Sequence, residues 1–122
     1  SASEIAAVLM PRMRDLCREV IKIVCLTATH RVSIIEEIEE GTVNQAHPIL
    51  REIFAKALMH HAAALICAHN HPSGNPRPSQ EDRQFTRELT YAGRVMNIPV
   101  LDHIIIGDNQ FYSFADEGNM AT

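Results

Sequence analysis

Two histidines and one aspartate have a spacing in the sequence that could bind a metal ion. His69 and His71 are separated by one residue at the end of an apolar run, and Asp82 follows eleven residues after His71. If the run is a β-strand, the two imidazoles point to the same face, because side chains at i and i+2 do so. Two neutral nitrogens and one carboxylate oxygen suit catalytic zinc, which keeps its fourth position open. The spacing therefore predicts one zinc ion and a reactive water on it.

The segment between these ligands favours the same interpretation. Pro72 stops the strand directly after the histidines and stiffens the exit of the chain. The stretch NHPSGNPRPS is dense in Pro, Gly, Asn and Ser, which indicates an ordered, turn-rich loop. A helix that starts near Ser79 would present Ser79 and Asp82 on its first turn, facing the end of the strand.

Each half of this pattern also has a simpler explanation. Two histidines one residue apart are usually ordinary loop residues. Ser79 and Asp82 ahead of an apolar helix are also typical of a capping box, with Ser79 as N-cap and Asp82 in place of the usual Glu. The two roles of Asp82 are compatible, because a carboxylate has two oxygens. The presence of both signals around one loop favours the metal site.

The rest of the chain predicts the elements that position these residues. Helical periodicity predicts three helices: residues 5–20, interrupted by Pro11; 48–61, opened by Pro48; and 80–96. Runs rich in β-branched residues predict five strands: 20–28, 31–40, 63–69, 98–107 and 110–115. The first two strands fit an antiparallel pair, and a turn at 107–109 separates the last two. This mixed order favours a central sheet with helices on its faces.

Length and composition restrict the class of protein. A chain of 122 residues is long enough for one domain and too short for two. The net charge of −4 disfavours nucleic-acid binding by this segment alone, since phosphates attract basic surfaces. Three widely spaced cysteines without a C-x-x-C motif favour a reducing, cytoplasmic setting. No apolar run approaches the roughly 20 residues that span a membrane.

The start of the chain suggests a piece of a longer protein. It begins with Ser1 and has no initiating Met. We therefore expect residues 1–122 to form one domain, the C-terminal part of a longer protein.

The motif H-x-H-P-x6-S-x2-D resembles the JAMM signature of JAB/MPN metalloproteases, which remove ubiquitin-like modifiers or cleave peptides. More narrowly, AHNHPSGNPRPSQED, IPVLDHIIIG and FYSF resemble segments of the bacterial RadC family, whose conserved domain has the JAB/MPN fold. The resemblance covers nearly the whole chain. It implies an α/β fold of the cytidine-deaminase-like type, a three-layer α/β/α sandwich around a mixed sheet. It also implies zinc ligands at His69, His71 and Asp82, and Ser79 as a donor to the tetrahedral intermediate.

The resemblance further requires a catalytic glutamate near the first strand, after the first helix. Glu19, just ahead of VIKIVCL, occupies the matching place. As a general base it would take a proton from the zinc-bound water and pass it to the leaving amine. Glu36, Glu37 and Glu52 are rivals for this role.

Two further residues have open interpretations. His103, in the DHIII segment that also resembles RadC, could support the metal ligands from behind or be a structural strand histidine, which we favour. Cys67 shares its strand face with His69 and could reach toward the ion, but a buried, apolar role is more typical.

Three functions follow from these patterns. The leading hypothesis is a zinc hydrolase of peptide or isopeptide bonds, whose substrate is a peptide or protein. The alternative is a non-catalytic, metal-stabilised binding module, linked to DNA repair through a missing N-terminal domain such as the helix-hairpin-helix segment of RadC-like proteins. A nuclease or deaminase ranks last, because the H-x-E and P-C-x-x-C elements of zinc deaminases are absent. A purely structural zinc would normally have a fourth protein ligand, which favours catalysis.

Overall fold

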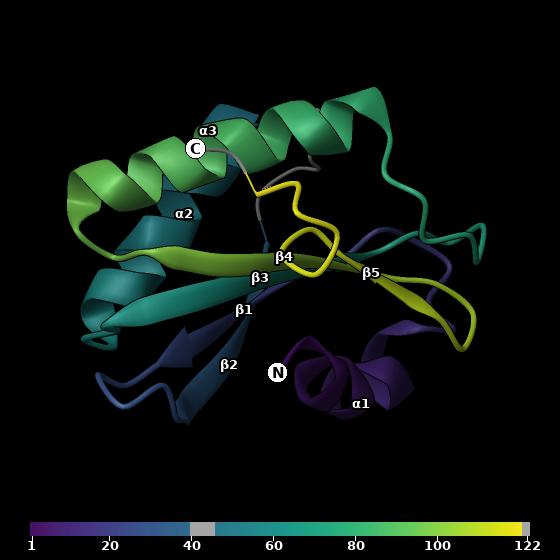
Figure 1. Cartoon of the computed structure of the whole chain (residues 1–122), viewed down its shortest axis with the longest axis horizontal. Helices are drawn as coiled ribbons and strands as arrows, with labels where there is room; N and C mark the ends of the chain where they lie inside the picture. Colours follow the sequence, from purple (N-terminus) through teal and green to yellow (C-terminus); the bar gives the residue numbers. More distant parts are fainter. Residues whose placement is uncertain (40–45, 121–122) are drawn as a thin grey trace.

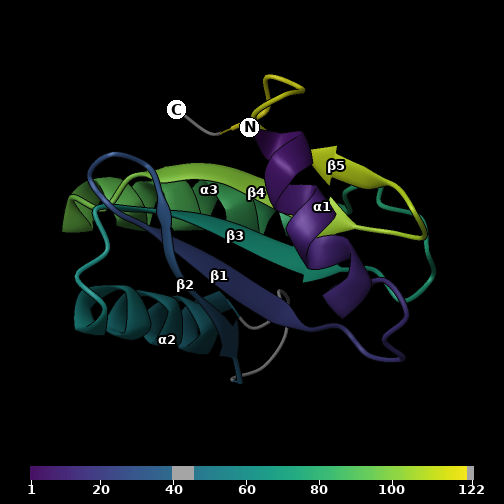
Figure 2. The same cartoon turned by 90° about the horizontal axis from the view of Figure 1, so that it is seen from below.

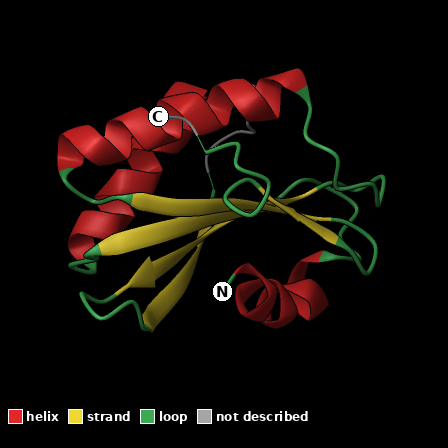
Figure 3. Ribbon diagram, in the orientation of Figure 1, coloured by secondary structure: helices red, strands yellow, loops and turns green. Residues whose placement is uncertain are grey.

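The computed structural model describes residues 1–39 and 46–120 and has three layers (Figure 1). Five strands form one mixed sheet in the order β2-β1-β3-β4-β5. The strands are β1 Ile21–Leu26, β2 Val32–Ile38, β3 Ala64–Asn70, β4 Val100–Ile106 and β5 Phe111–Ser113. The helices are α1 Ala2–Met13, α2 Ala46–Met59 and α3 Gln80–Met96. Helices α2 and α3 cover one face of the sheet and α1 covers the other, which confirms the predicted α/β/α class (Figures 2 and 3).

Most predicted elements are confirmed within a few residues, and α3 has the predicted bounds. The predicted break at Pro11 is wrong, because Pro11 lies inside the last turn of α1, where the Arg14 amide still donates to the Met10 carbonyl. The helix also starts earlier and ends earlier than expected, with a capping box formed by Ser1 and Glu4 at its start. The predicted strand over 31–40 ends at Ile38, and its last position lies outside the described residues.

Strand β3 is the centre of the molecule, since all seven of its residues are buried. Its alternating side chains enter two separate cores. Leu65 and Cys67 pack toward α2 and α3, whereas Ile66 and Ala68 pack toward α1. A strand covered on both faces needs a nearly continuous apolar sequence, as found here. The same alternation puts His69 on the α3 side of the sheet.

The connection from β3 to β4 brings distant residues to one edge of the sheet. These two strands are parallel, whereas the other pairs are antiparallel. Helix α3 makes the crossover, so its first turn follows the loop that leaves the carboxyl end of β3 (Figure 1). The N-terminal turn of α3 and the last residues of β3 are therefore neighbours.

Gly93 allows α3 to pack closely against the sheet, which gives a test of this packing. A Cβ atom there would lie 2.7 Å from the Ile98 carbonyl oxygen and 2.9 Å from Val100 Cγ2. Alanine usually stabilises a helix interior by about 1 kcal/mol relative to glycine. Here overpacking costs about 1–3 kcal/mol, so we expect Gly93→Ala to lower the free energy of unfolding in urea. Val95→Ala, at a residue that is 67% exposed, is the control and should change it by less than about 0.5 kcal/mol. A more stable Gly93→Ala protein would contradict this account.

Candidate metal centre

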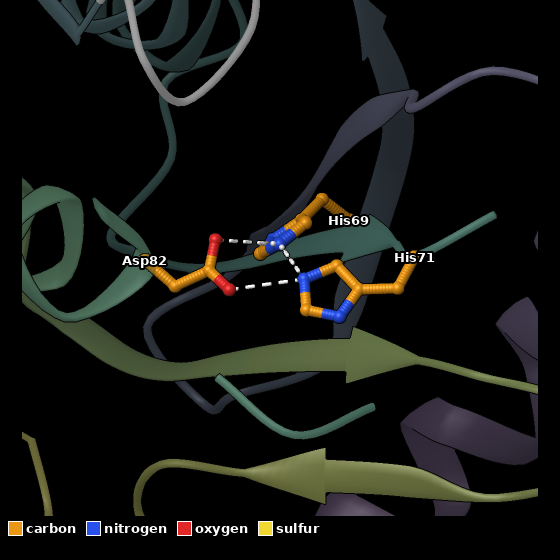
Figure 4. A group of neighbouring side chains, drawn as sticks. All are labelled: His69, His71 and Asp82. Atoms are coloured by element: carbon orange, nitrogen blue, oxygen red, sulfur yellow. Dashed lines mark hydrogen bonds and ion pairs between the residues drawn. The ribbon is translucent and has the colours of Figure 1, made fainter. Parts of the chain in front are cut away.

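The three predicted ligands converge on one point in the structure (Figure 4). His69 Nε2 and His71 Nε2 are 3.2 Å apart. Asp82 Oδ1 lies 3.1 Å from His69 Nε2, and Asp82 Oδ2 lies 2.9 Å from His71 Nε2. These side chains form a group that could hold a metal ion.

One side of this group is buried in the core, and the other side is exposed to solvent. The side chains of His69 and Asp82 are almost fully buried, whereas 18% of the His71 side chain is exposed. An ion between them would be shielded from behind by the core and reachable from the side of His71. This is the arrangement expected of a site that leaves a position for a small ligand.

The donor atoms fit zinc in both spacing and chemistry. A tetrahedral ion with nitrogen ligands at about 2.0–2.1 Å needs those nitrogens about 3.3 Å apart, close to the observed Nε2 separation. His71 Nδ1 is 2.9 Å from the Asn75 carbonyl oxygen. A carbonyl only accepts, so Nδ1 carries the hydrogen and the neutral ring presents a free electron pair on Nε2.

A buried chain of hydrogen bonds determines the tautomer of His69. The Thr86 hydroxyl donates its hydrogen to the backbone carbonyl of Asp82 over 2.8 Å. The Thr86 oxygen must therefore accept the hydrogen of His103 Nδ1, 2.6 Å away. His103 Nε2 is then an acceptor and receives the hydrogen of His69 Nδ1 over 2.8 Å. The electron pair of His69 Nε2 therefore faces the metal position.

The surroundings of His103 keep its ring neutral and fixed. The residue is fully buried and stacks on Phe114, with ring centroids 4.9 Å apart and planes 4° apart. Burial lowers the pKa of His103 well below its ordinary value. The ring is therefore neutral, as the hydrogen bonds from His69 and to Thr86 require. This contact with the candidate ligand His69 favours the supporting role of His103 over the purely structural one that the sequence favoured. Thr86 was not recognised at all from the sequence.

Charge within the group is shared between Asp82 and the histidines. Burial alone would raise the pKa of Asp82. A proton on Nε2 of His69 or His71 is donated to the carboxylate, and these hydrogen bonds outweigh burial and hold the pKa of Asp82 far below the usual range. The hydrogen bond to Asp82 in turn raises the pKa of His71. The carboxylate is therefore ionised at neutral pH and would balance part of the charge of a divalent cation.

Asp82 also has the capping role that was considered as an alternative. Its Oδ2 accepts the backbone N–H of Ser79 over 2.8 Å, and Ser79 Oγ accepts the N–H of Asp82 over 3.0 Å. The capping box is therefore present together with the contacts to the histidines, and Oδ2 takes part in both, since it also contacts His71 Nε2. The Ser79 residue is exposed, and its hydroxyl hydrogen is not used by this cap.

Glu19 lies beside the same group. Its Oε2 is 3.9 Å from His69 Nε2, and 20% of its side chain is exposed. The rival glutamates have partners elsewhere: Glu36 with His60, Glu37 with Lys22, and Glu52 with Lys56. The structure thus brings Glu19, and none of these three rivals, beside the candidate ligand His69.

The loop that carries His71 is attached to the turn between β4 and β5. The Asp108 amide donates to the Gly74 carbonyl over 2.8 Å, and the His71 amide donates to the Ile106 carbonyl over 2.9 Å. A Cβ atom on Gly107 would lie 2.4 Å from the Gly74 oxygen, so only glycine permits this contact. This support for the histidines was not foreseen, although a glycine directly after an apolar strand was a visible signal.

Cys67, the remaining candidate, is a buried core residue as expected. It is fully buried among apolar side chains, and burial raises the pKa of its thiol to about 12. Its sulfur is not among the ligand atoms that come together in the group of His69, His71 and Asp82.

Comparison with known proteins agrees with this site and fold. A family profile described as a RadC-like JAB domain matches residues 1–119. The chain belongs to the RadC-like JAB domain family. The resemblance inferred from the histidine motif is confirmed, and the domain combines this fold with a His-His-Asp group that could bind metal. No helix in the described part of this RadC-like domain is long and apolar enough to cross a membrane.

Curated UPF0758 proteins are relatives of this RadC-like JAB domain. One from Alkaliphilus metalliredigens is 43% identical over 122 residues, which cover 98% of this chain and 52% of the relative. Another from Symbiobacterium thermophilum is 46% identical over 112 residues, which cover 90% of this chain and 47% of the relative. The chain spans about half the length of the curated relatives it matches.

The hydrogen-bond chain behind His69 predicts an effect of His103 on metal affinity. We expect His103→Ala to weaken zinc binding about 10–100-fold, because the tautomer and orientation of the ligand ring are no longer maintained. Competition with a chromophoric chelator measures the affinity. His60→Ala, which removes a half-buried histidine paired with Glu36, is the matched control and should bind zinc like the wild type. Equal affinities for the two variants would rule out this role of His103.

Proton competition predicts the pH dependence of zinc binding. The raised pKa of His71 means that the folded, metal-free protein keeps its proton to a higher pH than a free histidine, whose pKa is about 6.5. Zinc must displace this proton, so the apparent affinity falls as the pH drops through the raised pKa, by about tenfold per unit for one proton. Calorimetric titrations between about pH 5.5 and 8 measure this slope, with circular dichroism to verify folding. An affinity that does not change over this range would contradict the prediction.

Proposed function

We propose that this RadC-like JAB domain is a zinc-dependent hydrolase of peptide or isopeptide bonds. One observation carries the proposal: a His-His-Asp group, open on one side, has the Glu19 carboxylate 3.9 Å from one of its nitrogens. A purely structural zinc site would have a fourth protein ligand in the place that is open here. The pairing of an open site with a nearby carboxylate is what metal-assisted hydrolysis requires.

Zinc at this position would polarise a carbonyl group and lower the pKa of a bound water to about 7. The protein's own residues would supply the remaining chemistry. Glu19 would accept a proton from the attacking water and deliver it to the leaving amine, a role that its partly exposed carboxylate beside the metal position supports. The Ser79 hydroxyl, whose hydrogen is free of the helix cap, would donate to the negative oxygen that develops on the carbonyl.

The other groups would keep these parts in place during the reaction. His103 and Thr86 would fix the His69 ring, and the Asn75 carbonyl would fix His71. Asp82, held by the cap of α3, would need little rearrangement to bind the ion. Such preorganisation reduces the cost of forming the active geometry.

The proposed substrate is a peptide or protein in the cytoplasm. All three cysteines are free thiols, and Cys17 is exposed, which suits a reducing compartment. The net charge of −4 gives no general attraction for nucleic-acid phosphates, which supports a protein substrate over DNA.

Metal content provides the first test of the proposal. We expect one zinc ion per chain in the wild type and a large loss in His71→Ala, because one of three ligands is gone. Inductively coupled plasma mass spectrometry of both proteins after dialysis measures the stoichiometry. His61→Ala, at a different histidine near the end of α2, is the control and should retain its zinc. Equal zinc in wild type and His71→Ala would eliminate the site.

Hydrolysis provides the second test. We expect the zinc-loaded wild type to cleave members of a peptide and isopeptide library, and Glu19→Gln to lower kcat by about 100–10,000-fold, because proton transfer is lost. Glu117→Gln, at an exposed glutamate, controls for the loss of one charge and should keep full activity. If the wild type cleaves nothing while it binds zinc, the non-catalytic binding module is the better description. Normal turnover by Glu19→Gln would remove Glu19 from the reaction.

A further inference from the structure

Asn70, the last residue of β3, makes two hydrogen bonds that the proposed function does not use. Its side chain is buried, with 1% of the residue exposed. Asn70 Oδ1 accepts the Val20 backbone N–H over 2.7 Å, and Asn70 Nδ2 donates to the Arg18 carbonyl over 3.0 Å. The residue between these two peptide groups is Glu19, so one amide side chain holds the backbone on both sides of the proposed base.

The segment that carries Glu19 has no strand of its own to hold it. Residues 14–20 belong to neither a helix nor a strand, and the ladder between β1 and β3 begins at the pair of Ile21 and His69. Figure 2 shows this connection from α1 to β1 passing the end of β3. One position beyond the pair of Ile21 and His69, backbone bonds between the strands stop. The Asn70 side chain makes hydrogen bonds to the backbone there instead.

The alternation of β3 separates this support from the metal ligands. His69 points to the α3 side of the sheet, so Asn70 points to the α1 side. The amide can hold the peptide groups around Glu19 without competing for the ion. The glutamate side chain meanwhile reaches His69 Nε2, so backbone support and carboxylate lie on opposite sides of the same short segment.

Asparagine is suited to this contact because its short side chain offers both a donor and an acceptor. Aspartate of the same shape would keep the acceptor for Val20 but lose the donor for Arg18. Alanine would lose both bonds and leave two peptide groups without their partner. Either change frees the segment before β1 to move.

We infer that Asn70 is a positioning residue, which holds the Glu19 carboxylate beside the metal centre. The inference rests on the proposed role of Glu19 for its catalytic consequence, but the placement itself can be measured without any activity. A displacement of about 1 Å in a reacting group can cost about 100-fold in rate, which is the loss of kcat expected for Asn70→Ala.

The placement is tested first, in the 122-residue chain loaded with Co²⁺ in place of zinc. In the wild type, the nearby paramagnetic ion should strongly shift and broaden the side-chain carbon signals of Glu19. In Asn70→Ala these effects should be much smaller, while the signals of the ligand His71 stay strongly affected, which shows that the metal is still bound. Ser33→Ala, which removes a hydroxyl bond to the Cys25 carbonyl at the other end of β1, should resemble the wild type.

Turnover on the most rapidly cleaved peptide is tested next, with a double variant. If Asn70 acts through Glu19, Asn70→Ala lowers kcat with little change in KM, and adding it to Glu19→Gln causes no further loss. Should Asn70→Ala fail to fold, Asn70→Asp replaces it in both experiments. Unchanged Glu19 signals in the folded Asn70 variant, or losses that multiply in the double variant, would overturn the inference. If Glu19→Gln has normal turnover, or the wild type has none, the proposed function fails, and the Co²⁺ experiment alone decides the placement.

Discussion

Two imidazole electron pairs that face each other at 3.2 Å in a nearly dry pocket repel unless a cation or a proton lies between them. The carboxylate of Asp82 completes this arrangement, because it adds a negative charge within 3.1 Å of both nitrogens. Much of the surrounding structure holds these three groups in place, although their mutual repulsion costs free energy. The Asn75 carbonyl and the neutral His103 ring occupy the opposite nitrogens, so that in the neutral His69 and His71 rings the metal-facing nitrogens carry the electron pairs.

One crossover connection of the fold brings His69, His71 and Asp82 together. Strand β3 is buried on both faces, so its end is rigid and His69 is already surrounded by core. Because β4 is parallel to β3, helix α3 must start near the end of β3, and its first turn carries Asp82. The loop between them is attached to the turn after β4 through Gly74 and Asp108. Three elements that are successive in the chain thus form a single support.

The sequence predicted the parts of this arrangement that are local. The spacing of His69 and His71, the cap at Ser79 and the period of α3 are patterns within a few residues, and all of them are found in the structure. The broken helix at Pro11 was wrong, because the helix loses the one bond from position 11 but still continues to Met13, where it ends two residues later. That exception depends on where the helix ends, which apolar spacing indicates poorly.

The partners that were missed are the distant ones. Thr86 and His103 meet only because α3 packs over β4, and Asn70 reaches Arg18 and Val20 across 50 or more positions. Nothing in the local pattern around these residues indicates such contacts, since they follow from the order of strands in the sheet. Family resemblance supplied Glu19 and agreed with the ligand set that the spacing predicted, but the side chains that orient them became visible only from the packing.

Asp82 shows why the two interpretations of the motif were hard to separate. The same carboxylate oxygen, Oδ2, accepts from the Ser79 amide and contacts His71 Nε2. The start of α3 is also the positive end of the helix dipole, which favours an ionised carboxylate there. The cap therefore does more than begin a helix: it keeps Asp82 charged and aimed at the histidines before any ion arrives. Helix start and candidate metal centre are one structural unit, so a sequence that forms this cap already fixes one of the three candidate ligands in place.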